Sequence, residues 1–372
     1  SPTPTLVTYT LSTVVKPLFA ATPHPRLHLA TARVLARPAD TQDTYHHQPW
    51  KDCPGLEEVL RWCILNTQSP TYEQIWPLIL PPTMTFLDDY EVPYKVLGVR
   101  LISDMLTCAP PELLLRTGVD ALLFTSLTNA LNHLRDPSTP ELIRAVVPTT
   151  LQLIDLTTPS PFNRLSTLLS SSILGTVILT GVPHPTLVAA SHVLPPVISA
   201  LGVGAARFLK GIVPVVEKTG QAQVNINEPL ALHLGALHVV NVLIDTCPSR
   251  IARWSTTITD GLARCWVGCV DAVSTDTAPA RLEVLRGRLQ EVAMELATAC
   301  PRVVRVSNQS EYRPLIFLPY STCQNEFTQL LEFDQTLFDG LVGSICTTQC
   351  DDPTLGVVAM NNSGNATSEI VS

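Results

Sequence analysis

Apolar residues recur at helical spacing through most of the chain, most clearly between residues 75 and 110. The first half of this stretch places four large apolar side chains on one helix face: Trp76, Leu80, Met84 and Leu87. Pro81 and Pro82 interrupt that helix, so we expect a kink there. The second half carries an unbroken apolar stripe from Tyr94 to Leu106, at the spacing of an amphipathic helix. The pattern therefore predicts two helices joined by a turn.

Acidic residues occupy the turn between these two helices. Asp88 and Asp89 directly precede the second helix, where a carboxylate can accept from backbone N–H groups that have no partner within the helix. We expect Asp88 and Asp89 to cap this turn and Lys95 to lie near one of them. A partly exposed pair of this kind would contribute at most about 1 kcal/mol.

Helical periodicity continues on both sides of this pair. It predicts further helical segments over 5–20, 24–37, 228–245, 251–270 and 281–299. Gly118 most simply ends one helix and frees the next. Apolar segments that contain proline recur, and Pro148 and Pro195 lie 47 residues apart, within the range of two-helix HEAT or armadillo units. We expect an all-α fold, an irregular HEAT/armadillo-like α-solenoid, with residues 315–320 as one ambiguous strand candidate.

The same pattern divides the chain into four predicted parts. We expect an N-terminal helical segment over 1–70, a solenoid core over 71–300, a partly helical acidic segment over 301–359 and a disordered tail over 360–372. The tail is polar and rich in small residues, so it has little to bury.

Charge and hydropathy narrow the classes of partner. Charged residues make up 15% of the chain, below the usual value of about 25%, and the mean hydropathy is +0.23. The net charge is −8, yet no Lys or Arg follows Arg313 and seven acidic residues do, which leaves −1 for residues 1–313. Phosphate-backbone binding needs clustered positive charge, so we do not expect nucleic acid as a direct ligand. The apolar excess favours a surface that meets a protein partner.

The membrane and redox signals indicate an intracellular, soluble chain. The ten cysteines include no C-x-x-C pair, and we expect free, buried thiols. Residues 165–206 contain no charged side chain, but four prolines and many hydroxyl groups interrupt them. We therefore expect buried solenoid helices there rather than a membrane span.

Motifs for chemistry are weak throughout. Gly202–Val203–Gly204 lacks the third glycine of a dinucleotide loop and follows paired prolines, so we expect close helix contacts there instead. Cys265 with Cys269, and the adjacent His46 and His47, do not complete a metal shell. No nucleophile elbow, zincin, P-loop or kinase signature is present. We expect no catalysis, cofactor or metal, and a hydrolase is the least favoured hypothesis.

Two blocks of the sequence resemble the TEL-two-interacting protein two family, the small HEAT-repeat subunit of the TTT (Triple T) co-chaperone complex. The first spans residues 76–119, with LLLRTGV at 113–119, and its motif positions are Trp76, Pro81, Asp88, Asp89, Lys95, Gly98, Arg116 and Gly118. The second is CPSRIARW at 247–254, continuing to Trp266. The order and spacing of the motifs carry the resemblance, which covers about residues 75–270.

The resemblance implies a scaffold with no reaction of its own. It would bind the larger HEAT-repeat subunits of the complex. Through them it would help phosphatidylinositol-three-kinase-related kinases mature and assemble, with the heat-shock-protein-ninety chaperone and its R-two-T-P adaptor. The implied location is the cytoplasm and nucleus, with no nucleic-acid or membrane partner. The alternative is a trafficking or nuclear-transport adaptor, although no acidic or Asn/Trp ladder of the cargo-reading kind is present.

The second block is the predicted partner-binding surface. Arg250, Arg253, Trp254 and Trp266 combine basic and aromatic character, which is typical of interface anchors. Trp76 and Trp254 are also expected to be packing anchors, and the loss of a buried tryptophan would destabilise the fold by about 3–5 kcal/mol.

Overall fold

The computed structural model of the chain describes residues 4–20, 23–28, 30–36, 48–67, 71–132, 136–175, 183–220, 230–273, 279–300 and 323–347. Within these ranges the structure is all-α, and the only strand-like pairing is an isolated bridge between Leu27 and Val34. This confirms the predicted fold class as an α-solenoid, while the HEAT/armadillo assignment stays a prediction. The strand candidate at 315–320, the tail at 360–372 and the His46–His47 pair lie outside the described residues.

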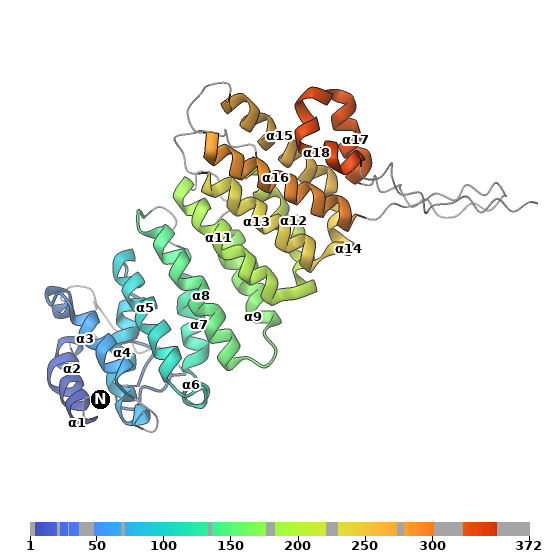
Figure 1. Cartoon of the computed structure of the whole chain (residues 1–372). Coiled ribbons are helices and arrows are strands. Elements are labelled where there is room, and N and C mark those ends of the chain that lie inside the picture. Colours follow the sequence, from blue (N-terminus) through green and yellow to red (C-terminus); the bar gives the residue numbers. More distant parts are fainter. Residues whose placement is uncertain are drawn as a thin grey trace, which may run out of the picture.

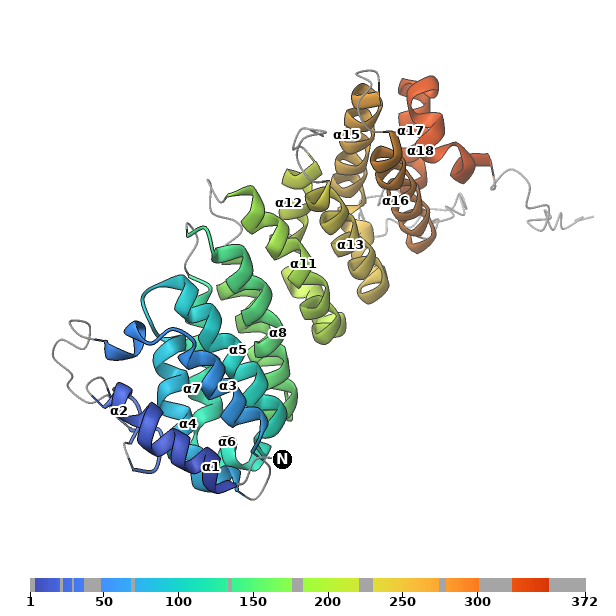
Figure 2. The same cartoon turned by 60° about the vertical axis from the view of Figure 1, so that its left-hand side comes forward.

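The helices stack in two layers along an elongated body (Figures 1 and 2). The first layer contains α3 (Leu56–Leu65), α5 (Val92–Cys108), α8 (Thr139–Thr157), α11 (His184–Leu201), α13 (Ala231–Thr246), α16 (Pro279–Ala299) and α18 (Gln335–Thr347). The second contains α4 (Tyr72–Leu87), α7 (Val119–Ala130), α9 (Phe162–Thr167) with the π-helix η3 (Leu168–Leu174), α12 (Leu209–Gly220), α15 (Ser255–Val273) and α17 (Cys323–Phe333). Each first-layer helix packs on its neighbours in the same layer and on a partner in the other.

Short elements complete the array. The N-terminal end is formed by α1 (Pro4–Tyr9), the π-helix η1 (Thr10–Val15), α2 (Lys16–Phe19) and the 3-10 turn η2 (Pro49–Asp52). The connections between layers include α6 (Pro111–Thr117), the 3-10 helix η4 (Gly202–Phe208), α14 (Pro248–Ile251) and the 3-10 helix η5 (Ala252–Trp254). α6 ends at Gly118, whose φ of +71° is the left-handed conformation that glycine adopts freely, as predicted.

The predicted helical pair at residues 75–110 forms α4 and α5. The four apolar residues of the first stripe are all buried, and α4 continues through Pro77, Pro81 and Pro82. Gly98 lies where α5 crosses the end of α4, and a Cβ there would overlap the backbone nitrogen of Leu87 and lie 2.7 Å from its Cα. The absence of a side chain at Gly98 therefore permits the close contact between these two helices.

The segment at 24–37 is not a helix, contrary to the prediction. Its described residues form turns and the Leu27–Val34 bridge, and the backbone N–H of Val34 donates to the carbonyl of Thr117 at 3.3 Å. His24 donates from Nε2 to Oδ2 of Asp88 at 3.0 Å, since its Nδ1 accepts from the backbone N–H of Arg26. The helical spacing failed here because contacts with α6 and with the α4–α5 turn bind the segment in a non-helical form.

Lys51 joins the N-terminal segment to the α4–α5 turn. Its Nζ lies 3.0 Å from Oδ2 of Asp89 and 2.7 Å from Oε1 of Glu91. The ammonium also lies over three aromatic rings, 4.4 Å from the centroid of Tyr90, 4.6 Å from that of Tyr94 and 5.3 Å from that of Trp50. Because the Asp89 side chain is fully buried, this cation supplies the charge that makes its burial tolerable.

The predicted capping of the turn is therefore corrected. The residue before α5 is Glu91, and no side chain caps the first turn of that helix. Asp89 instead accepts from the backbone N–H of Glu91 at 2.8 Å, while Asp88 contacts His24 and accepts from Ser126 at 3.2 Å. Lys95 lies near both aspartates, yet its Nζ donates to the carbonyl of Leu87 and burial lowers its pKa. Asp88 therefore contacts residues far away in the sequence, His24 and Ser126, and does not cap the first turn of α5.

An aromatic cluster packs beneath Lys51. Trp50 is buried and stacks on Phe19, with the ring centroids 5.8 Å apart. It also meets Phe86 and Tyr94 edge to face, at centroid distances of 4.6 and 5.0 Å. Such edge-to-face pairs add stabilisation beyond the area they bury, so this cluster ties α2 and η2 to the hairpin of α4 and α5.

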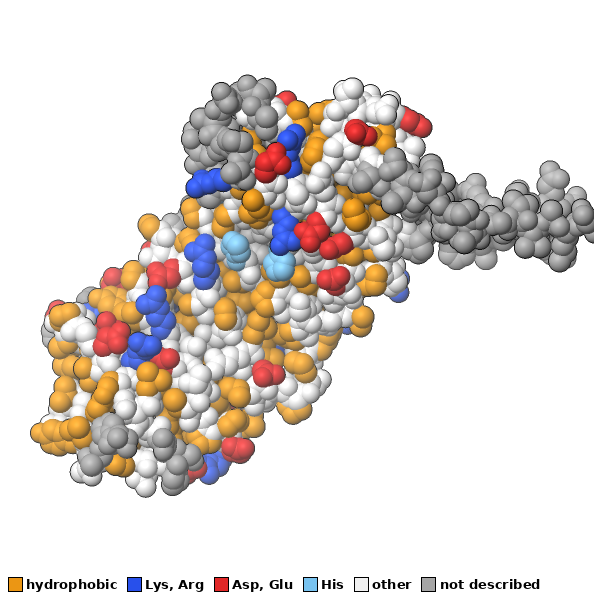
Figure 3. All heavy atoms as spheres, in the orientation of Figure 1, with side chains coloured by type: hydrophobic (Ala, Val, Ile, Leu, Met, Phe, Trp, Pro, Cys, Tyr) orange, Lys and Arg blue, Asp and Glu red, His pale blue; other side chains and the backbone are white. Residues whose placement is uncertain are grey.

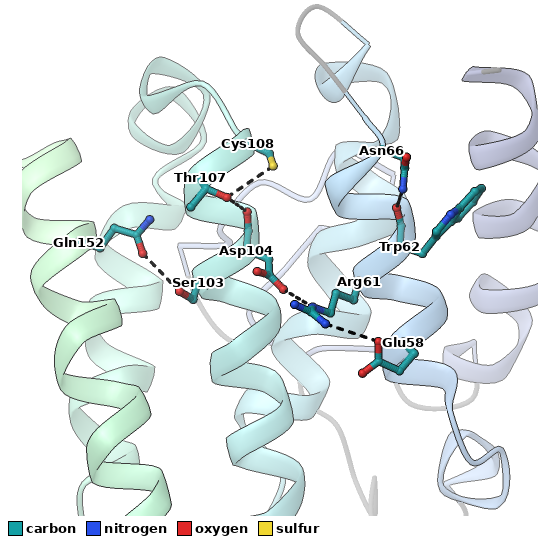
Figure 4. Close-up of polar contacts among 9 residues, drawn as sticks. All are labelled: Glu58, Arg61, Trp62, Asn66, Ser103, Asp104, Thr107, Cys108 and Gln152. Carbon is teal, nitrogen blue, oxygen red and sulfur yellow. Dashed lines mark hydrogen bonds and ion pairs between the residues drawn. The ribbon is translucent and has the colours of Figure 1, made fainter. Parts of the chain in front are cut away.

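On the outer face of the first layer, polar side chains of neighbouring helices form ion pairs and hydrogen bonds with one another. Arg61 on α3 donates from Nε to Oδ2 of Asp104 on α5 at 2.9 Å, and its Nη1 lies 3.8 Å from Oε2 of Glu58 (Figure 4). Ser103 donates to Gln152 on α8 at 3.4 Å. Figure 3 shows charges of both signs scattered over this face, so its cations are largely matched by neighbouring carboxylates.

We predict that Gly98→Ala lowers the free energy of unfolding by about 1–3 kcal/mol, because the new methyl group must displace the backbone of α4. Urea denaturation followed by circular dichroism measures this. The matched control is Gly287→Ala on α16, where nothing lies within 4 Å of the new Cβ. That change should stabilise by up to about 1 kcal/mol. An equal response of the two variants would contradict the close contact at Gly98.

We predict that Lys51→Met lowers the free energy of unfolding by about 3 kcal/mol, because the buried Asp89 carboxylate loses its cation. Arg61→Met is the matched control, since it breaks an exposed pair and should change stability by less than about 1 kcal/mol. Thermal and urea unfolding of the two variants side by side distinguish them. If Lys51→Met lowered the free energy of unfolding no more than Arg61→Met, the stabilising role of Lys51 beside buried Asp89 would be contradicted.

The stability contributed by the pairs of Lys51 with Asp89 and Glu91 should depend on pH in a defined direction. Burial alone lowers the pKa of Lys51, but hydrogen bonds to Glu91 and Asp89 raise it overall, and the bond from Lys51 lowers the pKa of Glu91. The difference in stability between wild type and Lys51→Met should therefore be greatest near neutral pH. It should shrink as pH falls through the lowered pKa of Glu91 and as pH rises through the raised pKa of Lys51. Urea titrations across this range measure it, and a difference independent of pH would contradict the assignment.

Candidate functional site

Most residues of the first motif block serve the fold. Trp76 and Gly98 are buried within the α4–α5 pair, and Pro81 lies inside α4. Arg116 is exposed and pairs with Glu73 at 3.0 Å, which links α6 to the start of α4. These contacts give the first block a role in the packing of α4, α5 and α6.

The second block lines an open cleft of about 770 Å³. One wall comes from η4 and the start of α12, and the other from α14 and η5. The lining residues are Ala206, Arg207, Leu209, Lys210, Ser249, Arg250, Ala252, Arg253 and Trp254. Both walls connect a first-layer helix to a second-layer helix, so the cleft lies between two consecutive turns at one edge of the solenoid, beside α14 in Figure 1.

The η4 wall is positioned by two glycines. Gly202 has a φ of +56°, which lets the chain leave α11 sharply. At Gly204 a Cβ would come within 2.7 Å of the Phe162 ring, so glycine allows η4 to pack on the preceding turn. Arg207 lies over the same ring at 5.1 Å. The predicted close approach at this glycine pair is thus present, and the segment is a 3-10 helix rather than a phosphate-binding loop.

The opposite wall follows a sharp change of direction. The axis turns by 112° between α13 and the helical run that begins at Pro248. Cys247, at the corner, is buried, and its thiol interacts with the backbone of Ala206 on the other wall. Burial raises the pKa of this thiol. This contact therefore joins the two walls of the cleft.

Among the described residues that line the cleft, every charged side chain is positive: four are cations and none is acidic. Lys210, Arg250 and Arg253 are exposed, and none has a carboxylate within ion-pair distance among the described residues. By contrast, Arg61, Arg100 and Arg116 each have such a partner. The cleft is consequently a local concentration of unmatched positive charge.

The tryptophans of the second block separate into two roles. Trp254 is half-buried in the cleft wall, where part of its ring remains accessible. Trp266 is buried, and its Nε1 donates to the carbonyl of Leu337 at 2.8 Å, beneath α18. Its ring packs inside the array, and its role as a partner contact stays a prediction.

The sequence reasoning missed Arg207 and Lys210. Both follow Gly202 and Gly204 closely in the sequence, so two basic residues beside this glycine pair were the signal that could have identified them. What the pattern lacked was the pairing of residues 206–210 with residues 249–254. Only the packing of successive solenoid turns brings these two segments together.

In the part of the chain that is described, potential metal-ligating side chains do not gather into a cluster. No group of three or more His, Cys, Asp or Glu side chains there is placed to hold a metal ion. Cys265 and Cys269 are buried and free, one turn apart on α15. A hydrogen bond with Cys269, together with burial, raises the pKa of Cys265, as expected for a packed thiol rather than a reactive one.

One helical run, residues 184–214, is long and apolar enough to cross a membrane by length and composition. Of its most apolar window, 56% is buried inside the solenoid, where α11 packs between α8 and α13. This burial fits the prediction that the uncharged stretch forms core helices.

Comparison with known proteins places the chain. The family model described as the Tti2 family matches residues 1–219, more than half of the chain and one wall of the cleft. TELO2-interacting protein 2 of mouse is 32% identical over 109 residues, the rat protein 33% over 109 and the human protein 29% over 111. Each match covers 29–30% of this chain but only 20% of the relative. No solved structure matches. On the extent of the family match, the chain belongs to the Tti2 family.

Proposed function

We propose that this protein is a non-catalytic scaffold subunit of a TTT-type co-chaperone assembly. The observation that carries the proposal is membership of the Tti2 family, based on residues 1–219. The curated relatives are named for interaction with TELO2, and we extend that interaction to this chain. In the proposal it binds the larger helical-repeat subunits and thereby supports the maturation and assembly of phosphatidylinositol-three-kinase-related kinases.

The form of the molecule supports a binding role. In a solenoid each unit contacts its neighbours only, which leaves long surfaces available along both layers. Large apolar side chains are exposed on the N-terminal elements: Leu6, Tyr9, Val14, Trp62 and Leu65. The cleft adds a concave site with an accessible tryptophan and arginines, the residue types that dominate binding energy at interfaces.

The wider setting follows from the same proposal. The heat-shock-protein-ninety chaperone and its R-two-T-P adaptor would be reached indirectly, through the larger subunits, in the cytoplasm and nucleus. A role in binding nucleic acid or membranes forms no part of the proposal.

We predict that the tagged chain, expressed in cells and recovered under native conditions, retains a TELO2-type protein and a second large helical-repeat protein at a near one-to-one ratio. Quantitative mass spectrometry of the eluate measures this. Lys51→Met serves as the destabilised control, because weakening the fold should reduce recovery of every partner together.

Other outcomes would redirect the assignment. Recovery of importins or coat proteins in place of the helical-repeat subunits would favour a trafficking or nuclear-transport adaptor. Recovery of no stable partner by a chain of full helicity would remove the scaffold proposal.

A further inference from the structure

We propose that the cleft between η4–α12 and α14–η5 binds an acidic, extended segment of a partner protein, with carboxylates paired to Lys210, Arg250 and Arg253. This inference rests on the proposed function, because it assigns a partner chemistry to a surface of the scaffold. The cleft is defined by the nine lining residues given above.

Charge complementarity selects the class of partner. Exposed cations held close together repel one another, so an anion placed between them relieves that repulsion as well as forming new pairs. Arginine presents a planar fork of donors that matches a carboxylate in two hydrogen bonds. With three cations unmatched and no acid among the described lining residues, the complementary ligand carries several carboxylates.

The apolar part of the cleft argues for a peptide. Leu209 is buried, Ala206 and Ala252 are half-buried, and Trp254 offers part of its ring beside the arginines. A segment that alternates acidic and apolar side chains would satisfy both surfaces, because successive side chains of an extended chain point in opposite directions. The geometry thus fits an extended acidic segment with at least one apolar residue.

A nucleic acid fits less well. Tracking a phosphate backbone requires a longer run of positive charge than two adjacent turns supply. The chain also carries Asp245 just before the α14–η5 wall and Asp260 shortly after it. A long polyanion would extend past the cleft toward these two carboxylates, whereas a short acidic segment can stay within the cleft.

The site is preformed, which favours binding without refolding. The contact between Cys247 and the backbone of Ala206 joins the two walls, and Phe162 packs against Gly204 behind them. Because the cations project from turns already fixed by packing, little conformational entropy is lost on binding.

The test measures binding of a fluorescein-labelled peptide of alternating Glu and Leu to the purified full chain by anisotropy. We expect saturable binding that weakens as salt concentration rises. Arg250→Glu with Arg253→Glu should weaken it by more than about tenfold, since like charges would then face one another. A peptide with Gln in place of Glu should bind weakly or not at all.

Two control variants distinguish an effect of the cleft from an effect of net charge and from a loss of folding. Arg144→Glu with Arg281→Glu changes the total charge equally at exposed positions on α8 and α16, away from the cleft, and should leave binding unchanged. Arg250→Gln with Arg253→Gln provides a milder variant if charge reversal disturbs the fold. Trp254→Phe should remove most of the change in tryptophan fluorescence caused by the peptide.

The outcomes are distinguishable from those of the co-purification experiment. If the wild-type chain retains its helical-repeat partners but does not bind the acidic peptide, the cleft assignment is overturned and the scaffold proposal stands. Equal loss of binding in the two double charge reversals would show a nonspecific charge effect and also overturn it. Tighter, Arg250-dependent binding of a single-stranded oligonucleotide would reassign the cleft to nucleic acid. Peptide binding without the helical-repeat partners would keep the cleft and remove the scaffold.

Discussion

The structure depends on the need of each internal helix to bury apolar surface on more than one side. α11 illustrates this constraint, because it contacts α8 and α13 within its own layer and reaches α9 and η4 across the turn. Most of its residues are buried, including the uncharged positions that pass a membrane-span test by composition. A helix so apolar is stable in water only between neighbours, and the array is what supplies those neighbours.

Polar interactions do a different task, which is to fix where the chain passes between layers. At the α4–α5 turn, Lys51 pairs with Asp89 and Glu91 while His24 contacts Asp88, so two separate N-terminal segments are tied to one turn. At the other end, buried Glu326 of α17 accepts from Ser255 and Thr256 of α15. Burial of the Asp89 and Glu326 carboxylates is compensated by specific donors, which fixes the register of the terminal elements.

The cleft follows from the same architecture. Because the chain returns from the first layer to the second at one edge, consecutive connections lie next to each other, and short 3-10 and helical turns leave a concave space between them. Gly202 and Gly204 set the course of one connection, and the corner at Cys247 sets the other. Among the described residues, Lys210, Arg250 and Arg253 on or beside these connections have no carboxylate within ion-pair distance, unlike Arg61 and Arg100 on the helical face. The position of unmatched charge at an edge is thus a consequence of helix stacking.

The sequence by itself determined the all-α class, the apolar stripes of α4 and α5, and the helix end at Gly118, because these depend on local periodicity and backbone conformation. It could not determine that Asp89 pairs with Lys51, that the described residues between 24 and 36 form turns and a bridge and no helix, or that Trp266 is covered by α18. Each of these depends on which distant segment competes for the same group. The basic cleft belongs to this second kind: Arg250 and Arg253 were identified from their residue types, but Arg207 and Lys210 joined them only through the packing of two turns about forty residues apart in sequence. Tertiary structure decided these features because burial and charge pairing act between neighbours in space, whatever their separation along the chain.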